Sequence, residues 1–84
     1  MGYVKEFRCL LEVEYLRFLE CHGYDEEGIQ LCEEILSQDS NNLECLFLYA
    51  IFLRKLQKPK EAIKILNEII QTLNEDVFHK KHFM

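Results

Sequence analysis

The sequence predicts an all-α fold of two stacked helix-turn-helix hairpins, a fragment of an α-solenoid, and three observations indicate it. Hydrophobic residues make up 49% of the 84 residues, whereas there are only three glycines and one proline, a composition that favours packed helices. Apolar residues recur every third or fourth position, which is the period of an amphipathic helix. The segment 16–40 also aligns with the segment 50–74, with Leu19 and Leu53 in register. The offset between the two segments is 34 residues, and an internal repeat of that length is typical of stacked helical pairs.

The first two helices are predicted over residues 3–22 and 25–38. In the first, apolar residues at every fourth position predict one buried stripe of Phe7, Leu11, Tyr15 and Leu19. Gly23 supplies a left-handed residue that ends this helix. Asp25 is expected to cap the second helix, whose predicted buried face comprises Gly28, Ile29, Cys32, Ile35 and Leu36.

The third and fourth helices follow the turn-rich residues 39–42. Asn41 and Glu44 have the spacing of a capping box for a third helix that ends near Leu56. This helix is apolar on every side over residues 45–53, so it must be covered by other elements all round. Pro59 fits the first turn of a fourth helix. Its predicted buried residues are Ala62, Ile63, Leu66, Ile69, Ile70 and Leu73.

The repeat divides the chain into a two-repeat helical domain, residues 1–76, and a short tail, residues 77–84. The two repeats cover about residues 9–42 and 43–76. Val77 stands one repeat length after Leu43, where the first helix of a third repeat would begin. We therefore expect residues 77–84 to form a tail or a truncated capping helix.

Charge and composition exclude several classes of function. The net charge of −5 disfavours binding to nucleic acid or to acidic lipid surfaces. The longest apolar run, residues 45–53, is about half of the ~20 residues needed to span a bilayer, so no membrane anchor is expected. Charge is divided unevenly: residues 1–42 carry three Lys/Arg against ten Asp/Glu, net −7, and residues 43–84 carry seven against five, net +2. Such polarity could orient a partner or support head-to-tail contact between copies.

The four cysteines have the pattern of small core residues. Cys9, Cys21, Cys32 and Cys45 are widely spaced along the sequence, without the close pairs of zinc sites or redox dithiols. A reducing compartment, the cytoplasm with the nucleus as the alternative, is the expected location. No nucleophile–base constellation or phosphate-binding glycine loop is present, so we expect no enzyme activity, no cofactor and no metal site.

The chain resembles the tetratricopeptide repeat family, whose helical hairpins build scaffolds for protein–protein contact. The resemblance covers roughly residues 9–76. It rests on small residues where helices pack and on turn residues, namely Gly23, Gly28, Ala50 and Ala62 with the turn of Asp39, Ser40, Asn41 and Asn42. Gln57 departs from the pattern, because glycine is usual at that position.

By this resemblance, the first helix of each repeat lines a concave groove. The groove residues are expected to be Leu10, Val13, Arg17, Glu44, Phe47, Ile51, Arg54 and Lys55, with Phe47 and Ile51 as apolar anchors. An adaptor that binds a helical or extended segment of a protein partner there is the leading hypothesis.

Two alternatives stay open. In the first, the chain is a structural subunit of a homo-oligomer or larger assembly and uses its open C-terminal end as the interface, through Leu66, Ile70, Leu73, Val77 and Phe78. In the second, it is a thiol- or metal-responsive protein that uses its cysteines, with His79 and His82 as further metal ligands.

Overall fold

The computed structural model describes the backbone of residues 2–82 and the side chains of residues 7–75. The chain forms four helices: α1 (Gly2–Cys21), α2 (Asp25–Gln38), α3 (Leu43–Lys55) and α4 (Pro59–His82). The described backbone contains helices and turns and no strand, which confirms the predicted all-α fold of helical hairpins. None of the helices in this part of the chain is both long and apolar enough to cross a membrane.

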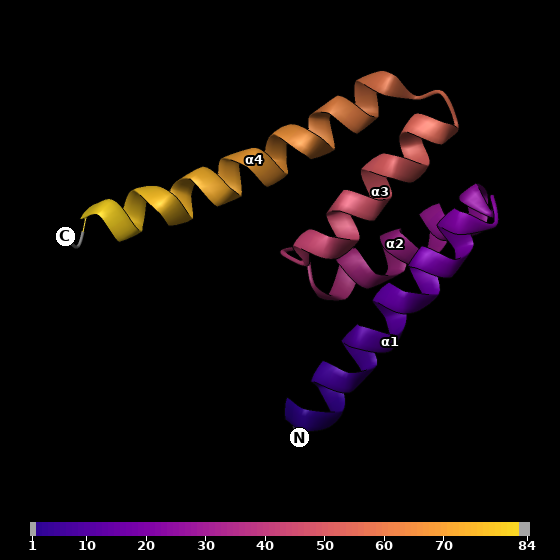
Figure 1. The fold of residues 1–84 in the computed structure, drawn as a ribbon, viewed down its shortest axis with the longest axis horizontal. Helices are drawn as coiled ribbons and strands as arrows, with labels where there is room; N and C mark the ends of the chain where they lie inside the picture. Colours follow the sequence, from indigo (N-terminus) through magenta and orange to yellow (C-terminus); the bar gives the residue numbers. More distant parts are fainter. Residues whose placement is uncertain (1, 83–84) are drawn as a thin grey trace.

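The central element is α3, which packs against each of the other three helices (Figure 1). In the described part of the chain α4 packs against α3 and against neither α1 nor α2. The shortest dimension of the molecule is 20 Å, about two helix diameters, so the helices form two layers. The far ends of α1 and α4 project away from this body like the arms of a V (Figure 1).

The core lies where α1, α2 and α3 meet. Its buried residues are Val13, Leu16, Leu19, Cys32, Ile35, Cys45, Leu48 and Phe52. Gly28 is required at the centre of this core, because a Cβ added there would lie 2.3 Å from Cζ of Phe52. The missing side chain lets α2 and α3 approach closely enough for the Phe52 ring to be fully buried.

Both hairpins turn through the same backbone geometry at equivalent positions of the two repeats. The amide of Tyr24 donates to the Leu19 carbonyl at 2.9 Å, and the amide of Lys58 donates to the Leu53 carbonyl at 2.9 Å, as in a Schellman motif. The left-handed residue is Gly23 in the first hairpin, with φ of 78°, and Gln57 in the second, with φ of 60°. The predicted role of Gly23 is confirmed.

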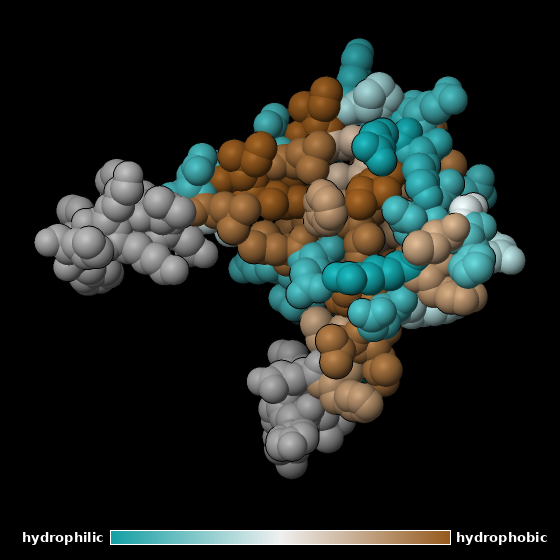
Figure 2. Space-filling model, in the orientation of Figure 1, coloured by the Kyte–Doolittle hydropathy of each residue, from teal (hydrophilic) through white to brown (hydrophobic). Residues whose placement is uncertain are grey.

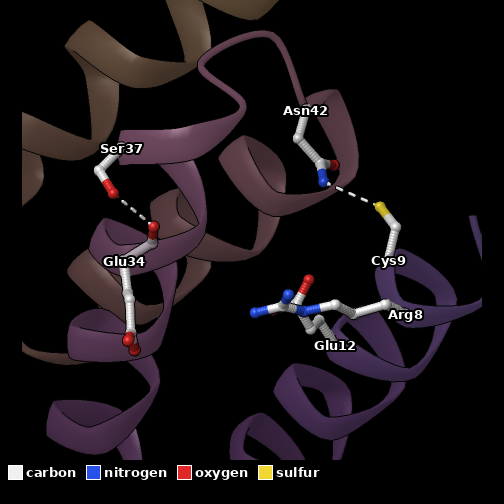
Figure 3. A network of polar contacts seen from close by, with 6 residues as sticks. All are labelled: Arg8, Cys9, Glu12, Glu34, Ser37 and Asn42. Carbon is white, nitrogen blue, oxygen red and sulfur yellow. Dashed lines mark hydrogen bonds and ion pairs between the residues drawn. The ribbon is translucent and has the colours of Figure 1, made fainter. Parts of the chain in front are cut away.

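The predicted caps at the helix starts were wrong by one residue. Asn42, and not Asn41, caps α3: its Oδ1 accepts from the Cys45 amide at 3.1 Å. The Asn42 amide group also donates to Sγ of Cys9 at 3.3 Å, which ties the start of α3 to α1 (Figure 3). Asp25 is already the first residue of α2, because the first helical bond uses the Tyr24 carbonyl, which accepts from the amide of Gly28.

The predicted buried stripe of α1 was right at Leu19 and wrong at its other three residues. Phe7, Leu11 and Tyr15 are more than half exposed, whereas Val13, Leu16 and Leu19 are buried. The reason is geometric: each step of four residues turns about 40° beyond one full helical turn, so a four-residue series drifts round the helix. Among the described side chains of α1, those on the side of Val13 and Leu16 meet the other helices.

Most of the apolar residues of α4 that the sequence predicted to be buried are exposed. Ala62 is buried and Ile69 is half-buried, as expected. The other predicted core residues of this helix are exposed, namely Ile63, Leu66, Ile70 and Leu73. They are exposed because α4 meets a single helix within the described residues.

The backbone of α4 runs without interruption across the predicted repeat boundary at residue 76 and ends at His82. No glycine or proline follows Pro59 to break it. Residues 77–82 therefore extend α4 instead of starting a separate helix.

Candidate functional site

Apart from Lys55, the predicted groove residues of α1 and α3 lie on one stripe of each helix, but they differ in accessibility. Leu10 is exposed and Val13 is buried. Arg17 of α1 pairs with Glu44 of α3 at 3.8 Å, with both side chains largely in water. This ion pair bridges the two helices at the surface, where it contributes little to stability.

An apolar hollow of ≈190 Å³ lies further along α3, at its junction with α4. Its lining residues are Phe47, Ala50, Ile51, Arg54, Ala62 and Leu66. Phe47 is 54% exposed and Leu66 is 38% exposed, so two large apolar side chains border the hollow without being covered. We call this hollow the open seat. Figure 2 shows hydrophobic surface gathered over the junction of α3 with α4.

The equivalent position in the first repeat is filled. Of the six lining residues, Ile51 and Arg54 correspond to the exposed Arg17 and the half-buried Glu20. Subtracting 34 from the other four, Phe47, Ala50, Ala62 and Leu66, gives Val13, Leu16, Gly28 and Cys32, respectively. All four of these are buried, and the helix that packs on both α1 and α2 is α3. The open seat therefore has the lining of a site for one more helix, and this lining is exposed to water.

The predicted assembly residues continue this surface along α4. Leu66 belongs to the open seat, while Ile70 and Leu73 follow at helical spacing and are about half exposed. Val77 and Phe78 lie on the same helix, but their side chains are outside the described residues. Two surfaces that the sequence predicted separately, the groove and the assembly interface, thus meet at Leu66.

A family comparison agrees with this repeat geometry. Residues 26–78, which include almost all of α2, the whole of α3 and most of α4, match the family model described as Tetratricopeptide repeat. The chain belongs to the tetratricopeptide repeat family. This confirms the resemblance, and repeats of this family generally mediate protein–protein interaction and are typically non-enzymatic. No curated protein and no solved structure matches the chain.

Lys55, a predicted groove residue of this tetratricopeptide chain, lies elsewhere. Its Nζ donates to the Glu20 carbonyl at 2.6 Å and lies 3.3 Å from Oε2 of Glu20 and 3.9 Å from Oδ1 of Asp25. These contacts join the end of α3 to the turn between α1 and α2. Lys55 thus holds the two repeats together and does not line the open seat.

Two of the four cysteines form a buried contact between the repeats. The Cys32 thiol donates to the Cys45 carbonyl, Sγ···O 3.9 Å, and the Cys45 thiol donates to the Cys32 carbonyl, 3.7 Å. The contact with Cys45, together with burial, raises the pKa of Cys32 far above the usual thiol range. Cys9 is half-buried and Cys21 is exposed. Among the described residues no three His, Cys, Asp or Glu side chains gather as a metal site would require.

The sequence interpretation missed the exposed face of α1. Leu11, Tyr15 and Phe18 are 56%, 54% and 55% exposed, and they lie together at spacings of four and three residues. We call these three residues the outer face of α1. The internal repeat could have identified this face. The equivalents of its residues in the second repeat are Cys45, Tyr49 and Phe52, which contact α2.

Proposed function

We propose that this tetratricopeptide chain is a non-catalytic protein-interaction module that binds an apolar helix of a protein partner in the open seat. The observation that carries the proposal is the contrast between the repeats. Val13 and Cys32 are buried under α3, whereas their equivalents Phe47 and Leu66 are open to water.

A helix fits the open seat better than an extended strand does. The seat has the lining of a site that a helix, α3, occupies in the first repeat. Its borders are two helices, and neither offers free backbone donors and acceptors for pairing with a strand. A partner helix with apolar residues one turn apart would contact Phe47 and Leu66 together.

The energetics call for several contacts at once. Completing the burial of a half-exposed Phe or Leu contributes about 1 kcal/mol. Association costs several times as much, so a partner must cover Phe47, Ile51 and Leu66 together to bind with useful affinity. Arg54 at the border is exposed and favours an acidic residue at the matching end of the partner helix.

The test is site-specific photo-crosslinking in cells that make the protein. A benzophenone amino acid replaces Phe47 in one chain and Gln30, an exposed residue of α2, in the control chain. We expect discrete protein adducts from position 47 that are absent from position 30. Adding Leu66→Glu to the position-47 chain should abolish them while its far-UV circular dichroism stays helical. Identical adducts from both positions, or adducts that survive Leu66→Glu, would contradict the proposal.

A further inference from the structure

The outer face of α1 reproduces the surface with which α3 packs on α2. Within the chain, Phe52 lies on Gly28 and the Tyr49 hydroxyl donates to Oε2 of Glu33 at 3.2 Å. The third contact is the reciprocal one between Cys45 and Cys32. Subtracting 34 from the three α3 residues gives Phe18, Tyr15 and Leu11, the outer face of α1. These three side chains point into water within the described chain.

The helix α4 carries the matching receiving surface. Adding 34 to Gly28, Glu33 and Cys32 gives Ala62, Asn67 and Leu66. Each new pair has compatible chemistry: Phe18 would rest on the small Ala62, the Tyr15 hydroxyl would bond the Asn67 amide, and Leu11 would meet Leu66. The methyl group of Ala62 requires the Phe18 ring to sit further out than the Phe52 ring sits on Gly28.

A fourth equivalence involves the stripe that borders the open seat. Inside the chain, Arg17 of α1 pairs with Glu44 of α3 at 3.8 Å. If α1 of a second copy packs on α3 as α3 packs on α1 within the chain, Ile51 of the first copy stands where Arg17 stood. Leu10 of the second copy then stands where Glu44 stood. An exposed ion pair thus becomes a contact between two apolar side chains, and Leu10 is among the most exposed leucines of the described chain. This substitution favours burial between molecules.

The lengths of the helices fit the same arrangement. α1 begins well before Cys9, the equivalent of the first residue of α3, and α4 continues well beyond Thr72, the equivalent of the last residue of α2. Within the chain, the end of α2 lies beside the start of α3, where a turn joins them. Between two molecules no turn is needed, so the two longer helices would continue side by side. Phe7 and Leu73, both about half exposed, lie on these extensions.

The net charges of the two halves of the chain also favour contact between α1 of one copy and the open seat of another. The half of the chain that contains α1 carries a net charge of −7, and the half that contains the open seat carries +2. Opposite ends of two copies therefore attract, whereas two α1 ends repel.

We infer that the partner helix in the open seat is α1 of a second copy, so that copies stack head to tail as one continuous repeat array. This inference rests on the proposed function, because it names the occupant of the same seat. The interface is heterologous: the outer face of α1 on one copy meets α3 and α4 of the next. Such contacts do not close after two copies, so longer chains form as concentration rises.

The test is sedimentation equilibrium with two complementary variants. Leu11→Glu disables the outer face of α1, and Leu66→Glu disables the open seat; both side chains are exposed in the single chain, and circular dichroism checks folding. We expect the wild type to exceed twice the 10.1 kDa chain mass at high concentration, while each variant alone associates at least about tenfold more weakly. An equimolar mixture keeps one intact pair of surfaces and should stop at a 1:1 dimer. Tyr24→Glu, which removes an equally exposed aromatic residue at the turn between α1 and α2, should behave as wild type.

Three results would overturn the inference. A wild type that stays monomeric at millimolar concentration would exclude self-stacking. A wild type that dimerises while the mixed variants stay monomeric would indicate a symmetric interface. Association that survives Leu11→Glu would exclude α1 as the occupant. If the Leu11→Glu variant does not fold, Tyr15→Glu takes its place in the experiment. The first result leaves the crosslinking test intact, since adducts of position 47 with a different protein would uphold the open seat and reject only the second copy.

Discussion

The ring of Phe52 lies directly on the backbone of Gly28, so that a Cβ at position 28 would stand 2.3 Å from Cζ of Phe52. This single contact fixes how closely α2 and α3 approach, and through them how the two repeats stack. The equivalent residue in the second repeat is Ala62, which already carries the methyl group that Gly28 lacks.

Gly28→Ala should destabilise the protein although alanine is the better helix former. The propensity gain is about 1 kcal/mol, but the overlap with a fully buried ring costs about 1–3 kcal/mol or more. Urea denaturation of Gly28→Ala, Phe52→Leu and the double variant checks this. If overlap is the cause, the double variant loses less stability than the sum of the single variants. Additive losses would point to another cause.

Gln57→Gly should stabilise the chain by about 0.5–1 kcal/mol. Gln57 has a φ of 60°, at the same turn position that Gly23 occupies in the first hairpin with a φ of 78°. A glycine adopts this left-handed conformation without the strain that a Cβ brings. The reverse change, Gly23→Ala, meets no atom within 4 Å, so its expected loss of about 1 kcal/mol reports backbone strain alone. Thermal unfolding of both variants gives the comparison; a melting temperature lowered by Gln57→Gly would contradict it.

Asn42→Ala should cost about 1 kcal/mol of stability. Its Oδ1 caps the Cys45 amide, and its amide group reaches Cys9 of α1. Asn41→Ala is the matched control, because Asn41 is exposed and is not the N-cap residue. Equal losses from the two substitutions in urea denaturation would show that the cap has been assigned to the wrong asparagine.

Two cationic side chains that form ion pairs between the repeats, Lys55 and Arg17, should differ in their contribution to stability. Lys55→Met removes a partly buried charge from the Glu20 carbonyl. It also leaves Oδ1 of Asp25, which is buried and accepts no hydrogen bond from the described residues, without its nearby cation. The expected loss is about 1–2 kcal/mol. Arg17→Met breaks a pair in which both side chains are largely in water, and should cost under about 0.5 kcal/mol. Chemical denaturation at low and high salt separates them, and the reverse order of the two losses would refute this interpretation.

Stability should fall at alkaline pH because of Cys32. Its contact with Cys45 and its burial raise its pKa in the folded state, while the same contact lowers the pKa of Cys45, so above pH 9 the folded pair keeps one proton that the unfolded chain releases. The free energy of unfolding is therefore unaffected by Cys32 well below pH 9, the ordinary value for this thiol, and decreases above it by up to about 1.4 kcal/mol per pH unit. Tyr49, whose pKa is raised by burial and by Glu33, adds a loss in the same direction above pH 10.

Denaturation curves between pH 7 and pH 10.5 measure this dependence. Cys32→Ala should be less stable than wild type at pH 7 but should show a shallower decline above pH 9. Cys21→Ala, which removes an exposed thiol, should keep the wild-type slope. A slope unchanged by Cys32→Ala would assign the alkaline loss to other groups.

The sequence was sufficient for features that depend on local spacing. The bounds of α2, the start of α4 at Pro59 and the left-handed Gly23 follow from turn chemistry and periodicity, and the structure confirms them. Burial was predicted less well, because it depends on which neighbours a helix has. A periodic stripe shows that a helix is amphipathic, but Leu11 and Leu66 are exposed since no described element covers those faces.

The direction in which a side chain extends was the other feature that the sequence could not predict. Position 55 was placed in the groove by resemblance alone, yet the Lys55 side chain extends to Glu20, because the carbonyl at the end of α1 and two carboxylates attract it. The repeat offset carried more information than was first taken from it. Applied to contacts instead of residue types, it relates the outer face of α1 to the open seat.

Within the described chain, α4 is held by α3 alone, and this has a dynamic consequence. The angle between the arms of the V depends on one helix–helix interface, so α4 can detach while α1, α2 and α3 keep their shared core. Amide hydrogens of α4 should therefore exchange with solvent sooner than those of α3. Since α4 forms one side of the open seat, any helix bound there also anchors α4. Occupancy would then be measurable as slower amide exchange along α4, including the turns beyond Leu66, the last residue of α4 that lines the open seat.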